Sequence, residues 1–193
     1  MRGSVSLLIV LFLAAPAVAQ QSPVGLEIGG GLDGALGETG ESANFGVHGS
    51  LSLRVKPAPI SSKELDLFAS IDYVAFSASR STNPDLRFIL AGFEARLRLL
   101  SGQPSGLYVI GGGGYAHTTR KAFDRERPVA AGTTLVRTVP ERTENNLFMT
   151  AGIGLIVTGN PSRFLFVEAR LTNIFGTAVK NYTFVPLTVG ISF

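Results

Sequence analysis

The closing stretch TFVPLTVGISF, residues 183–193, alternates apolar and polar side chains up to an aromatic last residue. A period of two is typical of a β-strand with one apolar face. The apolar positions are Val185, Leu187, Val189, Ile191 and Phe193. A strand at the edge of a sheet leaves backbone groups unpaired, and a closed barrel removes that edge by pairing its last strand with its first. The stretch therefore predicts the last strand of a closed β-barrel.

The same kind of pattern recurs along the chain and predicts eight strands in all. We place them near residues 22–32, 43–55, 65–78, 85–100, 106–119, 145–158, 163–174 and 182–193. Each is at least as long as the roughly 9–11 residues that a tilted membrane-spanning strand needs. The fold we expect is all-β: an eight-stranded antiparallel up-and-down transmembrane β-barrel, with the even strand count of single-chain bacterial barrels.

The alternation also predicts which face of each strand meets lipid. In segment 65–78, Leu67 and Ile71 share one face, while Asp66 and Asp72 share the other. A soluble β-sandwich would alternate too, with its apolar face turned inward. The strand count and the aromatic end favour the barrel, whose apolar face is turned outward.

The first residues have the pattern of a secretory signal peptide. Arg2 precedes an apolar stretch from Val5 to Ala15, and Ala17-Val18-Ala19 is a small-x-small cleavage site. The apolar stretch is shorter than the about 20 residues of a spanning helix, which disfavours an uncleaved anchor. We expect residues 1–19 to be a signal peptide and residues 20–193 to form the barrel.

Composition excludes several classes of function. The chain has no Cys, so disulfide frameworks and thiolate metal sites are excluded. Only 16% of the residues are charged and the mean hydropathy is +0.29, which strands with an apolar lipid face and a polar interior explain. The formal charge of +3 does not indicate nucleic acid, because the basic residues are mostly scattered or face acids.

The lengths of the connections predict the orientation. Gln103-Pro104 and Asn160-Pro161 mark tight turns after the fourth and sixth segments, and the connection after the second segment, Lys56 to Glu64, is intermediate in length. The other set of connections includes longer polar loops near 33–42, 79–84, 120–144 and 175–181. Barrels of this kind have short periplasmic turns and longer outer loops, so we expect both termini in the periplasm.

A few polar and aromatic side chains on the predicted lipid face fit this orientation. The polar ones are Arg87, His117, Asn173 and Thr183, all at the loop ends of their strands. A charge near the membrane surface costs about 0–1 kcal/mol, against about 2–4 kcal/mol at the midplane. Outward aromatics are expected at the two interfaces: Phe45, Tyr73 and Tyr115 near the outer rim and Phe193 at the other end.

Taken together, the pattern resembles the small eight-stranded outer-membrane barrels, the family that includes the transmembrane domain of outer membrane protein A and the outer membrane protein X and Ail-type barrels. The resemblance implies a monomer in the bacterial outer membrane, in contact with outer-membrane lipids including lipopolysaccharide. It also implies that the barrel-assembly machinery reads the last strand. The positions that match this assembly signal are Leu187, Val189, Ile191 and Phe193. Pro186 departs from the pattern, because it removes one donor of the strand ladder.

Nine charged side chains are predicted to face the interior, five acidic and four basic. They are Glu27, Arg54, Asp66, Asp72, Glu94, Arg96, Arg98, Glu168 and Arg170. An eight-stranded barrel is only wide enough for its own side chains, and an unpaired buried charge is very costly. We therefore expect a paired network that plugs the barrel. The alternative, a narrow selective pore, would favour a ring of charges of one sign.

Enzymatic and metal-binding motifs are weak. His48-Gly49-Ser50 matches the His-x-Ser pair of some eight-stranded enzymes that deacylate lipid A, which makes a lipid A-modifying hydrolase the second alternative. Both side chains are predicted to face the interior, and no acid in the same strand orients the His. The run Gly111–Gly114 lacks the Lys and Ser or Thr of a phosphate loop. His48 and His117 are too isolated to suggest zinc, so we expect no catalytic site, metal or cofactor.

The connection from Arg120 to Glu144 is the most distinctive surface. Its basic residues are Arg120, Lys121, Arg125, Arg127, Arg137 and Arg142, with acids interleaved. Thr133 to Val139 continues the strand pattern, so the hairpin is expected to project beyond the bilayer. Mixed charge is typical of a solvated loop. A functional interpretation is contact with lipopolysaccharide phosphates or with an extracellular ligand, since Lys and Arg at a membrane surface favour anionic headgroups. The expected function is structural or surface interaction.

Overall fold

A computed structural model describes residues 24–55, 65–78, 83–99, 106–130, 133–160, 163–176 and 181–193. The predicted signal peptide and the Gln103-Pro104 turn lie outside these residues. Among the described residues, no helix combines the length and the apolar character that a helical membrane span requires.

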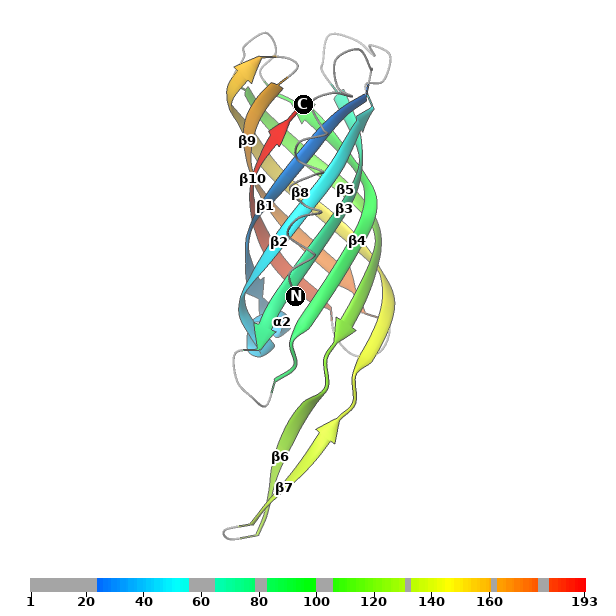
Figure 1. Cartoon of the computed structure of the whole chain (residues 1–193), viewed down its shortest axis with the longest axis vertical. Helices are drawn as coiled ribbons and strands as arrows, with labels where there is room; N and C mark the ends of the chain where they lie inside the picture. Colours follow the sequence, from blue (N-terminus) through cyan, green and yellow to red (C-terminus); the bar gives the residue numbers. More distant parts are fainter. Residues whose placement is uncertain are drawn as a thin grey trace, which may run out of the picture.

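Within these residues the chain forms ten strands and one short helix (Figure 1). They are β1 (Val24–Leu36), α2 (Gly37–Ser42), β2 (Ala43–Val55), β3 (Leu65–Ala78), β4 (Leu86–Arg98), β5 (Gly106–Arg120), β6 (Phe123–Ala130), β7 (Thr133–Val139), β8 (Arg142–Asn160), β9 (Arg163–Phe175) and β10 (Tyr182–Ser192). Eight of the strands close into a barrel in the order β1-β10-β9-β8-β5-β4-β3-β2, and β6 and β7 form a separate sheet. The predicted closed, antiparallel eight-stranded barrel is confirmed.

The last residue takes part in closing the barrel. β10 pairs with β1 from Glu27↔Ser192 to Leu36↔Thr183. Beyond these pairs, the Phe193 amide donates to the Leu26 carbonyl at 2.8 Å, and the Leu26 amide donates to the Phe193 carbonyl at 3.2 Å. The pairing of β10 with β9 reaches Phe184↔Thr172 and resumes at Leu187↔Ala169 in the same register. The missing donor of Pro186 thus interrupts the ladder locally without shifting it.

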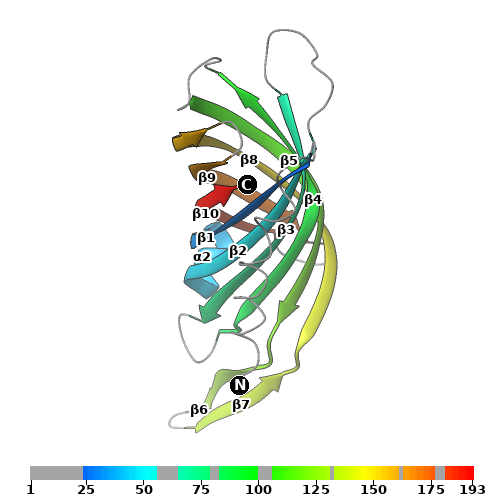
Figure 2. The same ribbon diagram turned by 45° about the horizontal axis from the view of Figure 1, so that its top comes forward.

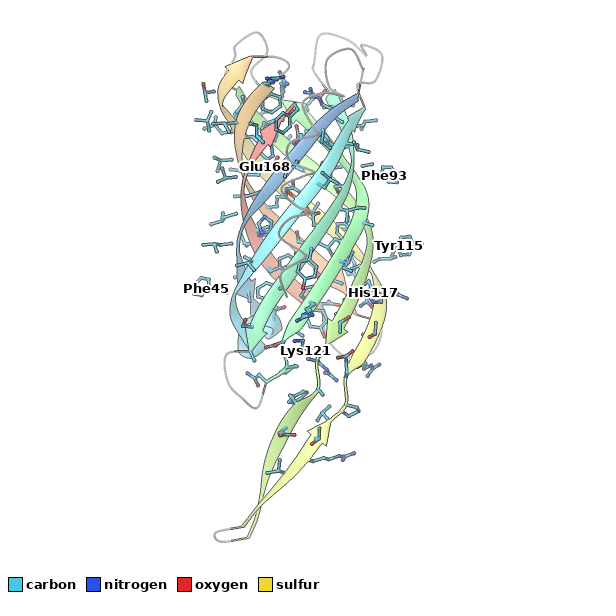
Figure 3. All side chains as sticks on the ribbon, viewed as in Figure 1. Phe45, Phe93, Tyr115, His117, Lys121 and Glu168 are labelled. Carbon is cyan, nitrogen blue, oxygen red and sulfur yellow. The ribbon has the colours of Figure 1, made fainter. Side chains whose placement is uncertain are left out.

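The two faces of the strands have the predicted assignment. Figure 3 shows Phe45, Phe93 and Tyr115 pointing away from the barrel. Phe45 and Phe93 are each 75% exposed, and Tyr115 is 71% exposed. Glu168, on the inner face of β9, is only 1% exposed. A soluble sandwich has the opposite arrangement, because water favours polar side chains outside. That alternative is therefore wrong.

The barrel has two unlike ends. At one end, α2 and the β6–β7 hairpin follow the rim, and we name this the hairpin end. At the other end β1 begins and β10 stops, and we name this the terminal end. The hairpin extends well past the rim in both views (Figure 1, Figure 2). Its register pairs Phe123 with Val139 and Arg125 with Arg137.

Two strand boundaries at the hairpin end differ from the prediction. The segment 33–42, expected to be a loop, is strand as far as Leu36 and helix over Gly37–Ser42. Gly37 has a φ of 53°, a left-handed conformation that glycine adopts without a steric penalty, and it lies where the strand becomes a helix. β8 begins at Arg142 instead of residue 145, because its ladder with β5 continues to Arg120↔Arg142.

The interior is less polar than predicted. At the hairpin end, which Figure 1 draws at the bottom, it holds a cluster of buried apolar side chains. We name it the upper apolar cluster: Val74, Phe76, Leu86, Phe88, Leu90, Ala116, Phe148, Ile174 and Phe184. The ring of Phe184 lies 5.6 Å from Phe76 and 5.7 Å from Phe88, centroid to centroid. A second group, the lower apolar cluster, contains Tyr108, Ile110, Ile156, Phe164 and Phe166. Because the barrel is too narrow for a water-filled lumen, apolar side chains can fill it as well as polar ones.

Two glycines make room for the aromatic rings of the lower apolar cluster. A Cβ at position 154 would lie 2.3 Å from Cζ of Tyr108, and a Cβ at position 190 would lie 2.2 Å from Cζ of Phe166. Both distances are far below van der Waals contact, so the two rings pack directly on the glycine backbone. Any larger residue would push the rings out of place.

We predict that Gly154→Ala lowers the free energy of unfolding by about 1–3 kcal/mol, because overpacking displaces a buried ring. The measurement is a urea titration of the refolded protein, followed by gel mobility without heating. Gly111→Ala is the matched control, since position 111 is outward and a Cβ there would have no neighbour within 4 Å. Equal midpoints for the two variants would contradict the prediction.

Candidate functional site

Five charged side chains meet inside the barrel, and we name them the ion-pair cluster: Glu27, Glu94, Arg96, Glu168 and Arg170. They come from β1, β4 and β9, where residues two apart share the inward face. Each is at most 7% exposed. The closing of the barrel brings together strands that are far apart in the sequence, and Figure 3 shows Glu168 within the ring of strands.

Two guanidinium groups are shared among three carboxylates. Arg96 Nη1 donates to Glu27 Oε2 at 2.6 Å and lies 3.2 Å from Glu168 Oε1. Arg96 Nη2 is 3.5 Å from Glu94 Oε2. Arg170 donates through Nη1 to Glu94 and through Nε to Glu168, the latter at 2.8 Å. Each buried arginine therefore faces at least two carboxylates, which compensates for the loss of water around these charges.

Aromatic side chains hold this arrangement in place. The Arg96 guanidinium lies 4.0 Å from the ring centroid of Phe68, a close cation–π contact. The Tyr108 hydroxyl donates to Glu168 Oε1 at 2.7 Å. Glu168 Oε1 thus contacts both the Tyr108 hydroxyl and the Arg96 guanidinium. Through Tyr108, the lower apolar cluster packs directly against the charges of the ion-pair cluster.

The other four predicted interior charges are not members of this cluster, although Asp72 and Arg98 line cavities together with cluster residues. Asp66 and Arg98 form their own pair at 3.7 Å, with side chains 15% and 21% exposed. The Arg54 guanidinium lies 5.6 Å from the Phe164 ring centroid. Asp72 lines a small cavity with His48 and Arg170. The structure therefore joins five of the nine predicted residues in one cluster and distributes the rest along the interior.

Little free space remains beside the cluster. A cavity of about 20 Å³ lies toward the upper apolar cluster, lined by Glu94, Arg170 and Phe148 among others. A second cavity of about 10 Å³ lies on the other side, lined by Glu27, Arg96 and Arg98. Each has room for about one water molecule. Charged, aromatic and aliphatic side chains fill the described interior between the two apolar clusters.

A second polar group was not predicted from the sequence. His48 Nδ1 lies 3.1 Å from Asp33 Oδ1, and its Nε2 is 2.9 Å from the Thr188 hydroxyl oxygen. The carboxylate beside the His comes from β1, while Ser50 faces Gly29 of that strand. Asp33 was missed because residues 33–42 were expected to be a loop. Its signal was the period of two, since Asp33 continues the inward positions of Glu27, Gly29 and Gly31.

The basic residues of the 120–144 connection are spread along its length. Lys121 Nζ lies 3.7 Å from Asp85, Arg142 Nε lies 2.6 Å from Glu144, and the Arg120 guanidinium lies 5.8 Å from the Phe123 ring. In the hairpin, Arg125 and Arg137 are register partners, and Arg127 pairs with Leu135. The predicted assembly-signal residues Leu187 and Val189 are 54% and 60% exposed on the outside of β10, and Ile191 follows on the same face. Among the described side chains, no group of three or more His, Asp or Glu residues could hold a metal ion.

The fold is shared with known proteins, although no protein-family model and no curated protein matches the chain by sequence. Neisserial surface protein A, NspA, superposes with a TM-score of 0.57 at 18% identity, over 89% of this chain and 96% of that one. Ail, the attachment invasion locus protein of Yersinia pestis, superposes with a TM-score of 0.50 at 12% identity, over 88% and 97%. The chain has the fold of the small eight-stranded outer-membrane β-barrels.

We predict that Arg96→Leu lowers the free energy of unfolding by about 3–5 kcal/mol, because it leaves buried carboxylates without their partner. The control is Arg142→Gln, whose side chain is 52% exposed; losing that ion pair should cost about 0–1 kcal/mol. Denaturant titration of the protein refolded into lipid vesicles measures both. A loss no larger for Arg96→Leu than for the control would show that the cluster contributes little to stability.

Proposed function

We propose that the chain is a non-enzymatic, non-conducting protein of the bacterial outer membrane that acts in envelope structure or surface interaction. Residues 1–19 are removed as a signal peptide, and residues 20–193 form the monomeric barrel. The observation that carries the proposal is a barrel with an apolar outer wall, a filled interior and a projecting hairpin.

The outer wall supports the membrane location. Large apolar side chains cover it on every barrel strand, from Leu32 on β1, 60% exposed, to Val189 on β10. Soluble monomers rarely expose apolar patches larger than a few hundred Å². In lipid, such a wall is favourable, and a closed barrel leaves no unpaired strand edge.

The two ends support an orientation. The longest connection, which runs from β5 to β8 through the hairpin, lies at the hairpin end, and both ends of the barrel sequence lie at the terminal end. Small barrels place long loops outside the cell and short turns in the periplasm. We therefore orient the hairpin outward and both termini toward the periplasm, where the assembly machinery would read Leu187, Val189, Ile191 and Phe193.

The filled interior argues against a channel. An ion crossing the barrel would have to separate Arg96 and Arg170 from their carboxylates and also displace the upper apolar cluster. Selective pores instead present rings of one charge or carbonyl groups around open space.

We predict that the purified protein gives no steady single-channel conductance in planar bilayers. The comparison is Arg96→Glu, a charge reversal at the centre of the ion-pair cluster. A steady conductance of the unmodified protein that this substitution abolishes would overturn the plugged interior and favour the narrow pore.

The geometry around His48 also argues against a lipid A hydrolase. Asp33, His48 and Thr188 have the order of an acid–base–hydroxyl triad. However, Thr188 is only 2% exposed, and the adjoining cavity of about 20 Å³ has no room for an acyl chain. A role in packing the interior fits these observations better. Mass spectrometry of lipid A from cells with and without the protein tests the alternative.

The hairpin supports a role at the surface. β6 and β7 continue the barrel wall past the rim and carry Arg125, Arg127 and Arg137 among acids. Two proteins with this fold have names that refer to such roles, a Neisserial surface protein and an attachment invasion locus protein. By analogy, we propose that the hairpin contacts lipopolysaccharide phosphates or an extracellular ligand.

We predict that replacing residues 122–140 by a short turn leaves a folded barrel in the outer-membrane fraction, because the hairpin forms a sheet separate from the barrel. Gel mobility with and without heating checks the fold. Binding to cells or to lipopolysaccharide should fall. Unchanged binding would overturn the surface role of the hairpin, and a soluble or inner-membrane location of the full chain would overturn the whole proposal.

A further inference from the structure

One part of the outer wall departs from the apolar pattern. At the hairpin end of three neighbouring strands, polar side chains point outward, and we name them the wall patch: Arg87, His117, Thr119, Thr143 and Asn145. Across β4, β5 and β8, Arg87 pairs with Thr119, which pairs with Thr143. One row further from the rim, His117 pairs with Asn145. The sequence predicted only Arg87 and His117 as outward polar residues here.

The wall patch is exposed and internally ordered. The outward side chains of Arg87, His117 and Asn145 are all exposed. His117 Nδ1 lies 2.8 Å from Asn145 Oδ1. An amide oxygen can only accept, so the imidazole Nδ1 carries the hydrogen in this bond. The NH₂ group of the Asn145 side chain then remains to donate to another partner. His117 Nε2, which carries no hydrogen in this tautomer, remains as an acceptor.

The position of the wall patch suits the boundary between headgroups and acyl chains. The row next to His117 holds Tyr115, which is 71% exposed, and the row beyond that holds Phe93 and Met149, at 75% and 62%. Figure 3 shows Tyr115 and His117 projecting from the same side of the barrel, with Phe93 further from the hairpin. Tyrosine at this transition is typical of a membrane interface.

The local charge suits an anion. Arg87 adds a cation to the patch, and Lys121 lies at the end of the same wall. Two of the nearby carboxylates already have partners: Asp85 faces Lys121 at 3.7 Å and accepts a hydrogen bond from the Ala78 amide at 2.9 Å, and Glu144 pairs with Arg142 at 2.6 Å. These two carboxylates would therefore repel an anion beside Arg87 less than unpaired ones.

From this geometry we infer that the wall patch binds the phosphorylated sugar headgroup of an outer-leaflet glycolipid. Arg87 holds the phosphate, because a guanidinium fork matches phosphate oxygens in a bidentate manner. The Asn145 amide and the hydroxyls of Thr119 and Thr143 bond the sugar, and His117 Nε2 accepts from a sugar hydroxyl. The acyl chains lie on the apolar rows further from the hairpin, which contain Tyr115, Phe93 and Met149. The inference rests on the proposed membrane location, since only a bilayer would hold the lipid at this height.

The test uses the purified full-length barrel, folded in zwitterionic micelles and titrated with lipid A. Nuclear magnetic resonance follows the Asn145 side-chain amide and the His117 imidazole, so the readout reports this patch alone. We expect saturable shifts with lipid A and weaker or no shifts with the same glycolipid after its phosphates are removed. Arg87→Gln should raise the half-saturation concentration about five- to tenfold, as expected for losing one cation near an anionic headgroup.

Two further variants make the result specific. Arg163→Gln removes an exposed arginine at the terminal end and should leave the titration unchanged. Asn145→Leu should weaken binding while Arg87 remains, with the His117 imidazole as the readout. Equal shifts with and without phosphate, or an Arg87→Gln titration that matches the unmodified protein, would overturn the inference. Because the assay needs only folded protein, its failure would leave the proposed location and surface role of the hairpin intact.

Discussion

The pairing of Arg96 and Arg170 with three buried carboxylates is the interaction on which the interior of this protein depends. A barrel of eight strands has no lumen wide enough for bulk water, so any interior charge must be neutralised by a neighbour. Here each arginine contacts one carboxylate on its own strand and at least one carboxylate on another strand. The cluster therefore connects β1, β4 and β9 across the barrel. It lies between the two apolar clusters, and the cavities beside it among the described residues have volumes of about 20 and 10 Å³.

The same constraint is the reason why the functions we propose are on the outer surface of the barrel. With a filled interior and a hydroxyl at Thr188 that no large substrate can reach, the described residues offer chemistry mainly on the wall and beyond the rim. The hairpin extends the strands into the surroundings, and the wall patch meets them at the membrane surface. Both lie at the hairpin end: the hairpin joins β5 to β8, and the wall patch spans β4, β5 and β8. A ligand of the hairpin and a lipid of the wall patch would thus be neighbours.

The predictions were right where the residues of a single strand are enough to decide the structure. The outward assignment of Phe45, Phe93 and Leu187 follows from alternation alone, because the pleat turns successive side chains to opposite faces. It failed where neighbours decide the structure. Asp33 was assigned to a loop, although its partner His48 lies on the adjacent strand. The apolar side chains of the upper cluster were not recognised as interior filling, since the sequence does not show how narrow the barrel becomes once it has closed.

The sequence by itself determined that this chain forms strands, how many of them enter the barrel and which side of each faces outward. These properties depend on a local period of two and on strand length. Only the tertiary structure decided which charges meet. Glu27 and Glu168 are 141 residues apart, yet both face Arg96, because barrel closure and register set these distances. The grouping of five interior charges into one cluster between two apolar clusters follows from that closure.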